Sequence, residues 1–213
     1  MIRRFASVVL TAAMLTLPAG PAHAEGSVAI VGSELLISPD PGAGSGVKVR
    51  REGTTYLVEV LPRATPGAGC SGDASSFTVT CPDPSNVVAL IVVHTGNLDS
   101  GVQNETATPI FAETGGGDDV LAQSGTAPAT LIGGPGNDLL QGGDGPDILR
   151  AGPGRDRVSA RGGTDVIQGG AGRDNIKASD GTRDRVNGGS GRDRARVDAA
   201  DRVRAVEREI VAG

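Results

Sequence analysis

Residues 133–150 read GGPGNDLLQGGDGPDILR, which is one nine-residue pattern written twice. Glycine stands at positions one, two and four, aspartate at position six and a large aliphatic residue at position eight. Three further units follow without a gap, beginning at residues 151, 160 and 169. Aspartate holds position six in all five units: Asp138, Asp147, Asp156, Asp165 and Asp174. This strict phase favours a stacked repeat over a disordered glycine-rich linker.

The repeat continues on both sides with irregularities. Upstream, residues 114–122 form a good unit with Asp119 at position six, and after the inserted Gln123 a weak unit has Ala129 there. Downstream, one extra residue follows Lys177 and the next unit is degenerate, with Asp184 at position six. The phase resumes in residues 188–196, which contain Asp193. Nine units therefore span residues 114–196.

The pattern resembles the RTX, or haemolysin-type, calcium-binding repeat, whose units read G-G-x-G-x-D-x-U-x with U a large aliphatic residue. The resemblance implies an all-β fold, a parallel β-roll in which two units form one coil and calcium ions lie between successive turns. It implies calcium ligands at the position-six aspartates and the turn glycines: Asp119, Asp138, Asp147, Asp156, Asp165, Asp174, Asp184, Asp193, Gly134, Gly136, Gly143 and Gly145.

Two units per coil place alternate units on opposite sides of the roll. One side stacks Asp119, Asp138, Asp156, Asp174 and Asp193, and the other stacks Ala129, Asp147, Asp165 and Asp184. Carboxylates stacked about 5 Å apart repel by about 3 kcal/mol per pair at an effective dielectric constant near 20. Calcium prefers carboxylate and carbonyl oxygens. We therefore expect the repeats to fold only when calcium is bound.

Seven arginines flank the later position-six aspartates: Arg155, Arg157, Arg173, Arg183, Arg185, Arg192 and Arg194. They are an alternative source of positive charge, able to neutralise the aspartate columns without a metal. We therefore expect the sites at Asp138 and Asp147, which no arginine flanks, to hold calcium more strongly than those at Asp184 and Asp193.

The N-terminal residues indicate export. Residues 1–24 combine a basic start, an apolar stretch and the small-residue sequence Ala22-His23-Ala24, as a signal peptide does. No later stretch has the roughly 18 to 20 apolar residues that a membrane helix needs. Cys70 and Cys81, the only cysteines, are predicted to form a disulfide. We expect a secreted, extracellular protein without a membrane span.

Residues 25–113 contain no nonapeptide run and read as short strands broken by turns. The predicted strands are residues 28–31, 35–38, 47–51, 55–60, 77–81 and 87–93. This region resembles the N-terminal part of secreted actinobacterial calcium-binding proteins. It suggests irregular solenoid coils, with a small β-sandwich as the alternative. Residues 197–213 leave the repeat and are expected to cap the roll.

Composition narrows the function. With no Trp, one Tyr and three Phe, the chain has few aromatic residues for a broad globular core or for stacking on nucleic-acid bases. His94 is the only histidine after the leader, and no hydrolase or metalloprotease motif accompanies it. We expect a calcium-binding protein, not an enzyme, with no nucleic-acid partner. The alternatives are an adhesin or matrix component with a cell-surface or polysaccharide partner and a small β-helical carbohydrate-active enzyme using Asp118 and Asp119.

Overall fold

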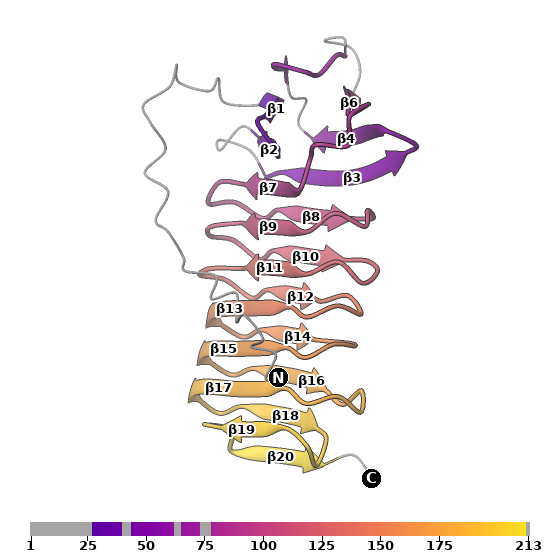
Figure 1. Ribbon diagram of the computed structural model, residues 1–213. Coiled ribbons are helices and arrows are strands. Elements are labelled where there is room, and N and C mark those ends of the chain that lie inside the picture. The colour runs from indigo at the N-terminus through magenta and orange to yellow at the C-terminus, as the bar shows by residue number, and fades with distance from the viewer. Residues whose placement is uncertain (1–26, 40–43, 62–64, 73–77, 212–213) are drawn as a thin grey trace, which may run out of the picture.

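The computed structural model describes residues 27–39, 44–61, 65–72 and 78–211. These residues form strands and turns with no helix among them, and therefore no helix that could cross a membrane. The strands make two ten-stranded sheets. From β7 onward successive strands alternate between the two sheets, so the chain winds as a parallel β-solenoid (Figure 1). The predicted all-β fold with a parallel roll is confirmed.

The solenoid strands pair in parallel with the strand one coil away. One sheet contains β7 (Leu90–His94), β9 (Ile110–Glu113), β11 (Ala129–Ile132), β13 (Ile148–Gly154), β15 (Val166–Gly172), β17 (Arg185–Gly191) and β19 (Arg202–Arg204). The other contains β8 (Gly101–Asn104), β10 (Val120–Gln123), β12 (Leu139–Gln141), β14 (Arg157–Ser159), β16 (Asn175–Ala178), β18 (Arg194–Val197) and β20 (Arg208–Val211). Parallel coils therefore begin upstream of the first nonapeptide unit and continue beyond the last one.

The N-terminal strands extend both sheets as antiparallel hairpins. In one sheet β1 (Ser27–Val31) pairs with β2 (Glu34–Ser38), which lies parallel to β7. In the other, β3 (Gly46–Glu52) pairs with β4 (Thr55–Leu61) and lies parallel to β8. The short strand β5 (Thr65–Pro66) and β6 (Thr78–Pro82) form the outer edges. The N-terminal region therefore stacks directly on the first coil.

The expected N-terminal strands match the described strands to within one residue at each end, except at the start of β7. Strand β7 starts three residues later than the predicted strand at residues 87–93, because the Asp83 carboxylate accepts hydrogen bonds from the amides of Val87 and Val88. The predicted disulfide is confirmed, and it joins Cys70 to Cys81 in β6. The signal peptide predicted at residues 1–24 lies outside the described residues.

The core of the repeats is centred on a narrow column of large aliphatic side chains, one from each of the strands β10 to β17. Leu121, Leu140, Val158 and Ile176 stack in one sheet, and Leu131, Leu149, Ile167 and Val186 stack opposite them. All are at most 2% exposed. These are the position-eight residues of the units, so the nine-residue period sets the register of both sheets.

Candidate metal centre

The structure buries all eight predicted aspartate ligands. Each position-six side chain is at most 2% exposed, although these aspartates lie in the turns that precede the strands. Burial of a carboxylate is costly unless its oxygens are paired. The contacts of the two carboxylate oxygens of each aspartate therefore determine what the site can bind.

One oxygen of each carboxylate holds the coils together. Oδ1 of Asp138 accepts a hydrogen bond from the backbone amide of Asp119, one coil earlier, at 2.9 Å. The same contact repeats along the column at 2.7–3.0 Å, from Ser100 to Asp119, Asp138 to Asp156, Asp156 to Asp174 and Asp174 to Asp193. The Asp193 amide donates to the carboxylate of Glu207, which ends the column.

The second column follows the same rule on the other side of the roll. The amides of Ala129, Asp147 and Asp165 donate at 2.8 Å to Oδ1 of Asp147, Asp165 and Asp184 respectively. The Asp184 amide then donates to Oδ1 of Asp201. The two columns thus have the composition expected from the alternation of units. Asp201 and Glu207, which end them, were not anticipated from the sequence because they lie outside the repeat.

The inserted residues do not break either column. Gln123 is fully buried at the end of β10, beside Asn104 in β8, and its Oε1 accepts a hydrogen bond from the Asn104 amide group at 2.8 Å. Ala178 is buried in the equivalent place beside Val197. Each insertion is therefore absorbed at a strand end, and the aspartates keep their stacking.

The other carboxylate oxygen is left free in seven of the eight aspartates. Oδ2 is buried without a hydrogen-bond partner among the described residues in Asp119, Asp138, Asp156, Asp165, Asp174, Asp184 and Asp193. In Asp147 it accepts a hydrogen bond from the Gly143 amide at 2.8 Å. Buried polar atoms are rarely unpaired in folded proteins. Seven unpaired carboxylate oxygens in two columns indicate that a cation belongs beside them.

In the units of Asp138, Asp174 and Asp193, a glycine at position one leaves space beside the free oxygen. A Cβ atom on Gly133 would lie 2.2 Å from Oδ2 of Asp138 and 2.8 Å from the carbonyl oxygen of Ala151 in the next coil. Glycine therefore keeps a carboxylate and a carbonyl oxygen facing the same small space. Carboxylate and carbonyl oxygens are the ligands that calcium prefers, so the residues present fit a calcium ion.

The four glycines expected among the ligands also allow the coils to approach closely. Gly134 has a φ of +105°, and a Cβ there would lie 1.7 Å from the carbonyl oxygen of Gly115. A Cβ on Gly136, Gly143 or Gly145 would meet a backbone carbonyl of the preceding coil at 1.7, 2.3 or 2.1 Å. Packing alone therefore requires these glycines, whatever their carbonyl groups bind.

Burial raises the pKa of seven aspartates in the columns. It raises the pKa of Asp156 and Asp165 to about 7, and that of Asp138, Asp147 and Asp184 to about 6, with neighbouring carboxylates adding to the effect. The pKa values of Asp119 and Asp174 are raised for the same main reason. Without a cation, the columns therefore retain protons at pH values where an exposed aspartate is fully ionised.

The arginines do not neutralise the columns, which corrects the alternative drawn from the sequence. All seven flanking arginines are exposed, whereas the aspartates between them face inward. Among the described residues, every ion pair involves side chains between Lys48 and Glu113. Adjacent residues of an extended chain point to opposite faces, so proximity in sequence does not place an arginine beside the carboxylate.

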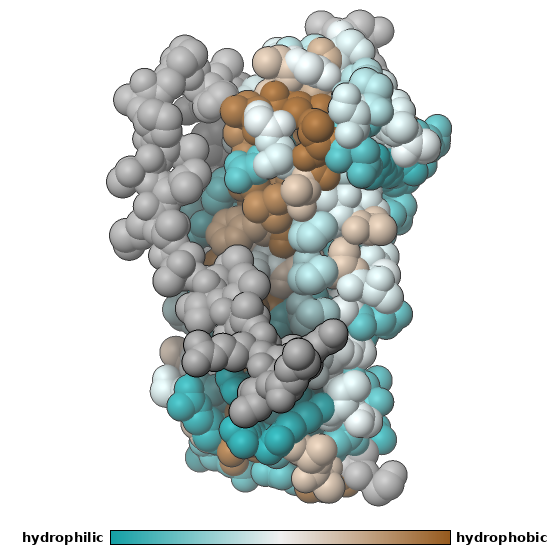
Figure 2. All heavy atoms as spheres, in the orientation of Figure 1, coloured by the Kyte–Doolittle hydropathy of each residue, from teal (hydrophilic) through white to brown (hydrophobic). Residues whose placement is uncertain are grey.

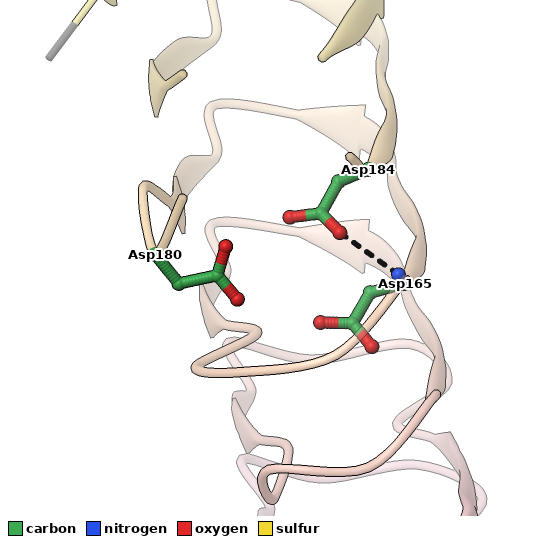
Figure 3. A group of neighbouring side chains, drawn as sticks. All are labelled: Asp165, Asp180 and Asp184. Carbon is green, nitrogen blue, oxygen red and sulfur yellow. Dashed lines mark hydrogen bonds between the residues drawn. The ribbon is translucent and has the colours of Figure 1, made fainter. Parts of the chain in front are cut away.

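One acidic residue near the columns was missed in the sequence. Asp180 replaces the glycine expected at position two of the degenerate unit, and one of its carboxylate oxygens lies within 4.8 Å of an oxygen of Asp165 and of Asp184. Figure 3 shows the three carboxylates turned toward one another. The signal in the sequence that points to Asp180 is an acidic residue at a position where the repeat has glycine. Its significance depends on the fold, because Asp165 lies in another coil.

The residues considered for catalysis do not converge. Asp119 is buried, whereas Asp118 is exposed and accepts a hydrogen bond from the Asn137 amide at 2.8 Å. His94 lies half-exposed on the surface, with Nδ1 3.5 Å from Oε2 of Glu113. Among the described residues, the buried candidate functional groups are therefore those of the two aspartate columns, and not a pair of Asp118 or His94 with another residue.

The comparisons with known proteins agree with this geometry. Residues 132–167 and 159–195 match the family model of the RTX calcium-binding nonapeptide repeat (4 copies). No curated protein and no solved structure gave a match to the chain. The matched stretch contains both aspartate columns from Asp138 to Asp193. Residues 132–195 of this chain are RTX nonapeptide repeats, which bind calcium.

Proposed function

We propose that the chain is a secreted protein whose β-roll folds around calcium ions bound between successive coils. The observation that carries the proposal is the set of seven buried carboxylate oxygens without a partner among the described residues. The ligands in this proposal are the free Oδ2 atoms of the position-six aspartates and backbone carbonyl oxygens of the glycine turns, including those of Gly134, Gly136, Gly143 and Gly145. Asp147, whose Oδ2 is hydrogen-bonded, belongs to the column of Asp165 and Asp184, because its Oδ1 accepts the amide of Ala129 as the other column aspartates accept theirs.

The two oxygens of each carboxylate have different roles. Oδ1 is held by a backbone amide of the preceding coil, which fixes the orientation of the carboxylate. Oδ2 is thereby left facing the gap between coils. A bound calcium ion supplies the positive charge that offsets carboxylate repulsion. Neighbouring aspartates define four gaps in one column and two in the other, so we expect up to six ions.

Calorimetric titration and circular dichroism of the same sample test this function. We expect strand signal to be lost in EGTA and recovered in millimolar calcium, the range typical of extracellular calcium modules. Asp156→Asn alters two gaps and should remove one or two ions. Asp118→Asn is the matched control, because Asp118 is exposed and Asn keeps its acceptor oxygen. No calcium heat from the unaltered chain, or equal stoichiometry in both variants, would contradict the proposal.

The proposed export rests on the leader-like residues 1–24 and on the disulfide, a bond typical of oxidising compartments. Expression of the full sequence in a secreting host gives a direct measurement. The protein recovered from the medium should begin at Glu25, as shown by N-terminal sequencing. Retention of the complete chain inside the cell would contradict export.

A second candidate function, attachment to an anionic polysaccharide, is favoured by the charge of the outer surface. Residues 150–213 carry fourteen basic side chains, all exposed, and none forms an ion pair among the described residues. Five of the ten acidic side chains in this stretch are buried column aspartates. Figure 2 shows hydrophilic residues gathered over the C-terminal coils, around β17 to β20 in Figure 1.

Two pairs of arginines lie in register on neighbouring strands of the C-terminal coils. Arg185 pairs with Arg202, and Arg194 with Arg208, so positive charges repeat at the strand spacing of about 4.8 Å. A linear polymer carrying regular carboxylate or sulfate groups is complementary to such rows. Residues 150–213 contain no aromatic side chain for base stacking, which favours a polysaccharide over single-stranded nucleic acid.

Affinity chromatography distinguishes a polysaccharide partner from a nucleic-acid partner. We expect retention on heparin in the presence of calcium, elution by salt, and no retention on uncharged dextran. The variant with Arg194→Gln, Arg196→Gln and Arg208→Gln should elute at lower salt. Passage through heparin without delay would refute this second function, and stronger retention on DNA-cellulose would assign a different partner.

A further inference from the structure

The gap between Asp165 and Asp184 contains a third carboxylate, that of Asp180. Among the described residues, this is the only group of three or more acidic, histidine or cysteine side chains whose ligand atoms all lie within 4.8 Å of one another. The calcium–oxygen distance is about 2.3–2.6 Å, so one ion can contact two oxygens up to roughly 5 Å apart. All three carboxylates are therefore within reach of a single calcium ion.

Two of the three carboxylates have a free oxygen that is fully buried. Asp165 and Asp184 are both 0% exposed, and Oδ2 of each has no hydrogen-bond partner among the described residues. Their Oδ1 atoms are already used, by the amides of Asp147 and Asp165. In Figure 3 the Asp184 oxygen that does not accept the Asp165 amide is directed toward Asp180. The buried, unpartnered atoms thus face the third carboxylate.

Contacts with Thr182 hold the Asp180 side chain in its turn. Oδ1 of Asp180 accepts hydrogen bonds from the Thr182 amide at 2.7 Å and the Thr182 hydroxyl at 2.8 Å. These contacts fix the Asp180 side chain above the gap.

From this arrangement we infer that Asp165, Asp180 and Asp184 form a calcium site of higher affinity than the other gaps, and that this site fills first. The inference rests on the proposed calcium-binding function. Calcium affinity in proteins is tuned by the number of charged ligands, and in no other gap among the described residues do three carboxylates lie within 4.8 Å of one another. The inference also reverses the expectation that the site at Asp184 is weaker than the site at Asp138.

Calorimetric titration with calcium chloride tests the inference on the chain with Asp180→Asn. Asparagine keeps the acceptor oxygen for Thr182 and removes the charge, so we expect the turn to persist. The unaltered chain should show one site at least about tenfold tighter than the rest. Asp180→Asn should lose that site and keep the weaker ones. Asp144→Asn is the matched control, since Asp144 is an exposed aspartate in a turn of the same column, and should retain the tight site.

The outcomes separate this inference from the proposed function. No calcium heat from the unaltered chain refutes calcium binding itself. Calcium binding in a single affinity class, or a tight site that survives Asp180→Asn, overturns only the three-carboxylate site. If Asp180→Asn lacks strand signal at saturating calcium, Asp180→Glu decides, because it retains the charge. Retention of the tight site in Asp180→Glu supports the inference, and its loss overturns it.

Discussion

Acidification should fold the calcium-free chain, although acid unfolds most proteins. The perturbation is a change from pH 8 to pH 5 in EGTA. Burial raises the pKa of Asp156 and Asp165 from 3.8 to about 7 and that of Asp138, Asp147 and Asp184 to about 6. At pH values between 3.8 and these raised pKa values, the folded chain binds more protons than the unfolded chain. Its free energy of unfolding therefore falls as pH rises through this window.

The magnitude follows from the pKa values. At pH 8, where both states are ionised, a pKa of about 7 corresponds to a cost of about 4 kcal/mol per aspartate, and one of about 6 to about 3 kcal/mol. Lowering the pH to 5 raises the free energy of unfolding by about 1.5 to 2.5 kcal/mol for each of these aspartates. Two such groups already change stability by a large fraction of the 5 to 15 kcal/mol that holds an ordinary domain together.

Circular dichroism at 25 °C across pH 4.5–8.5, with EGTA or calcium, measures this effect. We expect strand signal in EGTA to grow as pH falls and, with calcium, to persist at pH 8. Asp156→Asn should weaken the pH dependence because its side chain is neutral throughout. Asp118→Asn should weaken it less, because the Asp118 charge is only a minor cause of the raised pKa of Asp138 and Asp156. A calcium-free chain that is equally folded at pH 5 and pH 8, or that unfolds on acidification, would refute the reasoning.

Two further predictions concern packing and the disulfide. Gly134→Ala places a Cβ 1.7 Å from a carbonyl oxygen, whereas Gly125→Ala, with a similarly positive φ of +86°, meets no atom within 4 Å. Both should lose about 1 to 2 kcal/mol to backbone strain, and Gly134→Ala should lose at least about 2 kcal/mol more as coils separate. Thermal melts in calcium compare them, and equal melting temperatures would contradict the packing argument. Replacing Cys70 and Cys81 by serine should cost about 2 to 3 kcal/mol in the N-terminal hairpins and leave calcium stoichiometry unchanged. A calorimetric loss of ions would show that the hairpins and the roll are coupled.

The resemblance to the RTX repeat implied the solenoid with two units per coil, and the nine-residue phase then predicted its register. It placed Leu140 between Leu121 and Val158, and the order of aspartates in both columns, because parallel stacking leaves little freedom once the period is known. The orientation of the arginines does not follow from their closeness to the aspartates in sequence, because successive side chains of a β-strand point to opposite faces.

Other features depended on tertiary structure. Asp180 lies in a unit that departs from the pattern, and its proximity to Asp165 arises only when the coils stack. The pairing of β2 with β7 and of β3 with β8 joins segments far apart in the chain. Short alternating strands specify which face is buried, but many partners satisfy the same pattern. The stacking of the hairpins on the roll was therefore left open.

The direction of the aspartate hydrogen bonds has a consequence for how the repeat can change by mutation. Each carboxylate serves the amide of the coil before it, so loss of an interior aspartate leaves a buried amide without its acceptor. Ala129 heads its column, and the amide of Ile110, one coil earlier, donates instead to the carbonyl of Pro128 at 3.3 Å. Loss of a position-six aspartate should therefore cost least where a backbone carbonyl accepts the amide instead, as at Ala129. This does not hold for the N-terminal end as such, because Asp119 accepts the amide of Ser100.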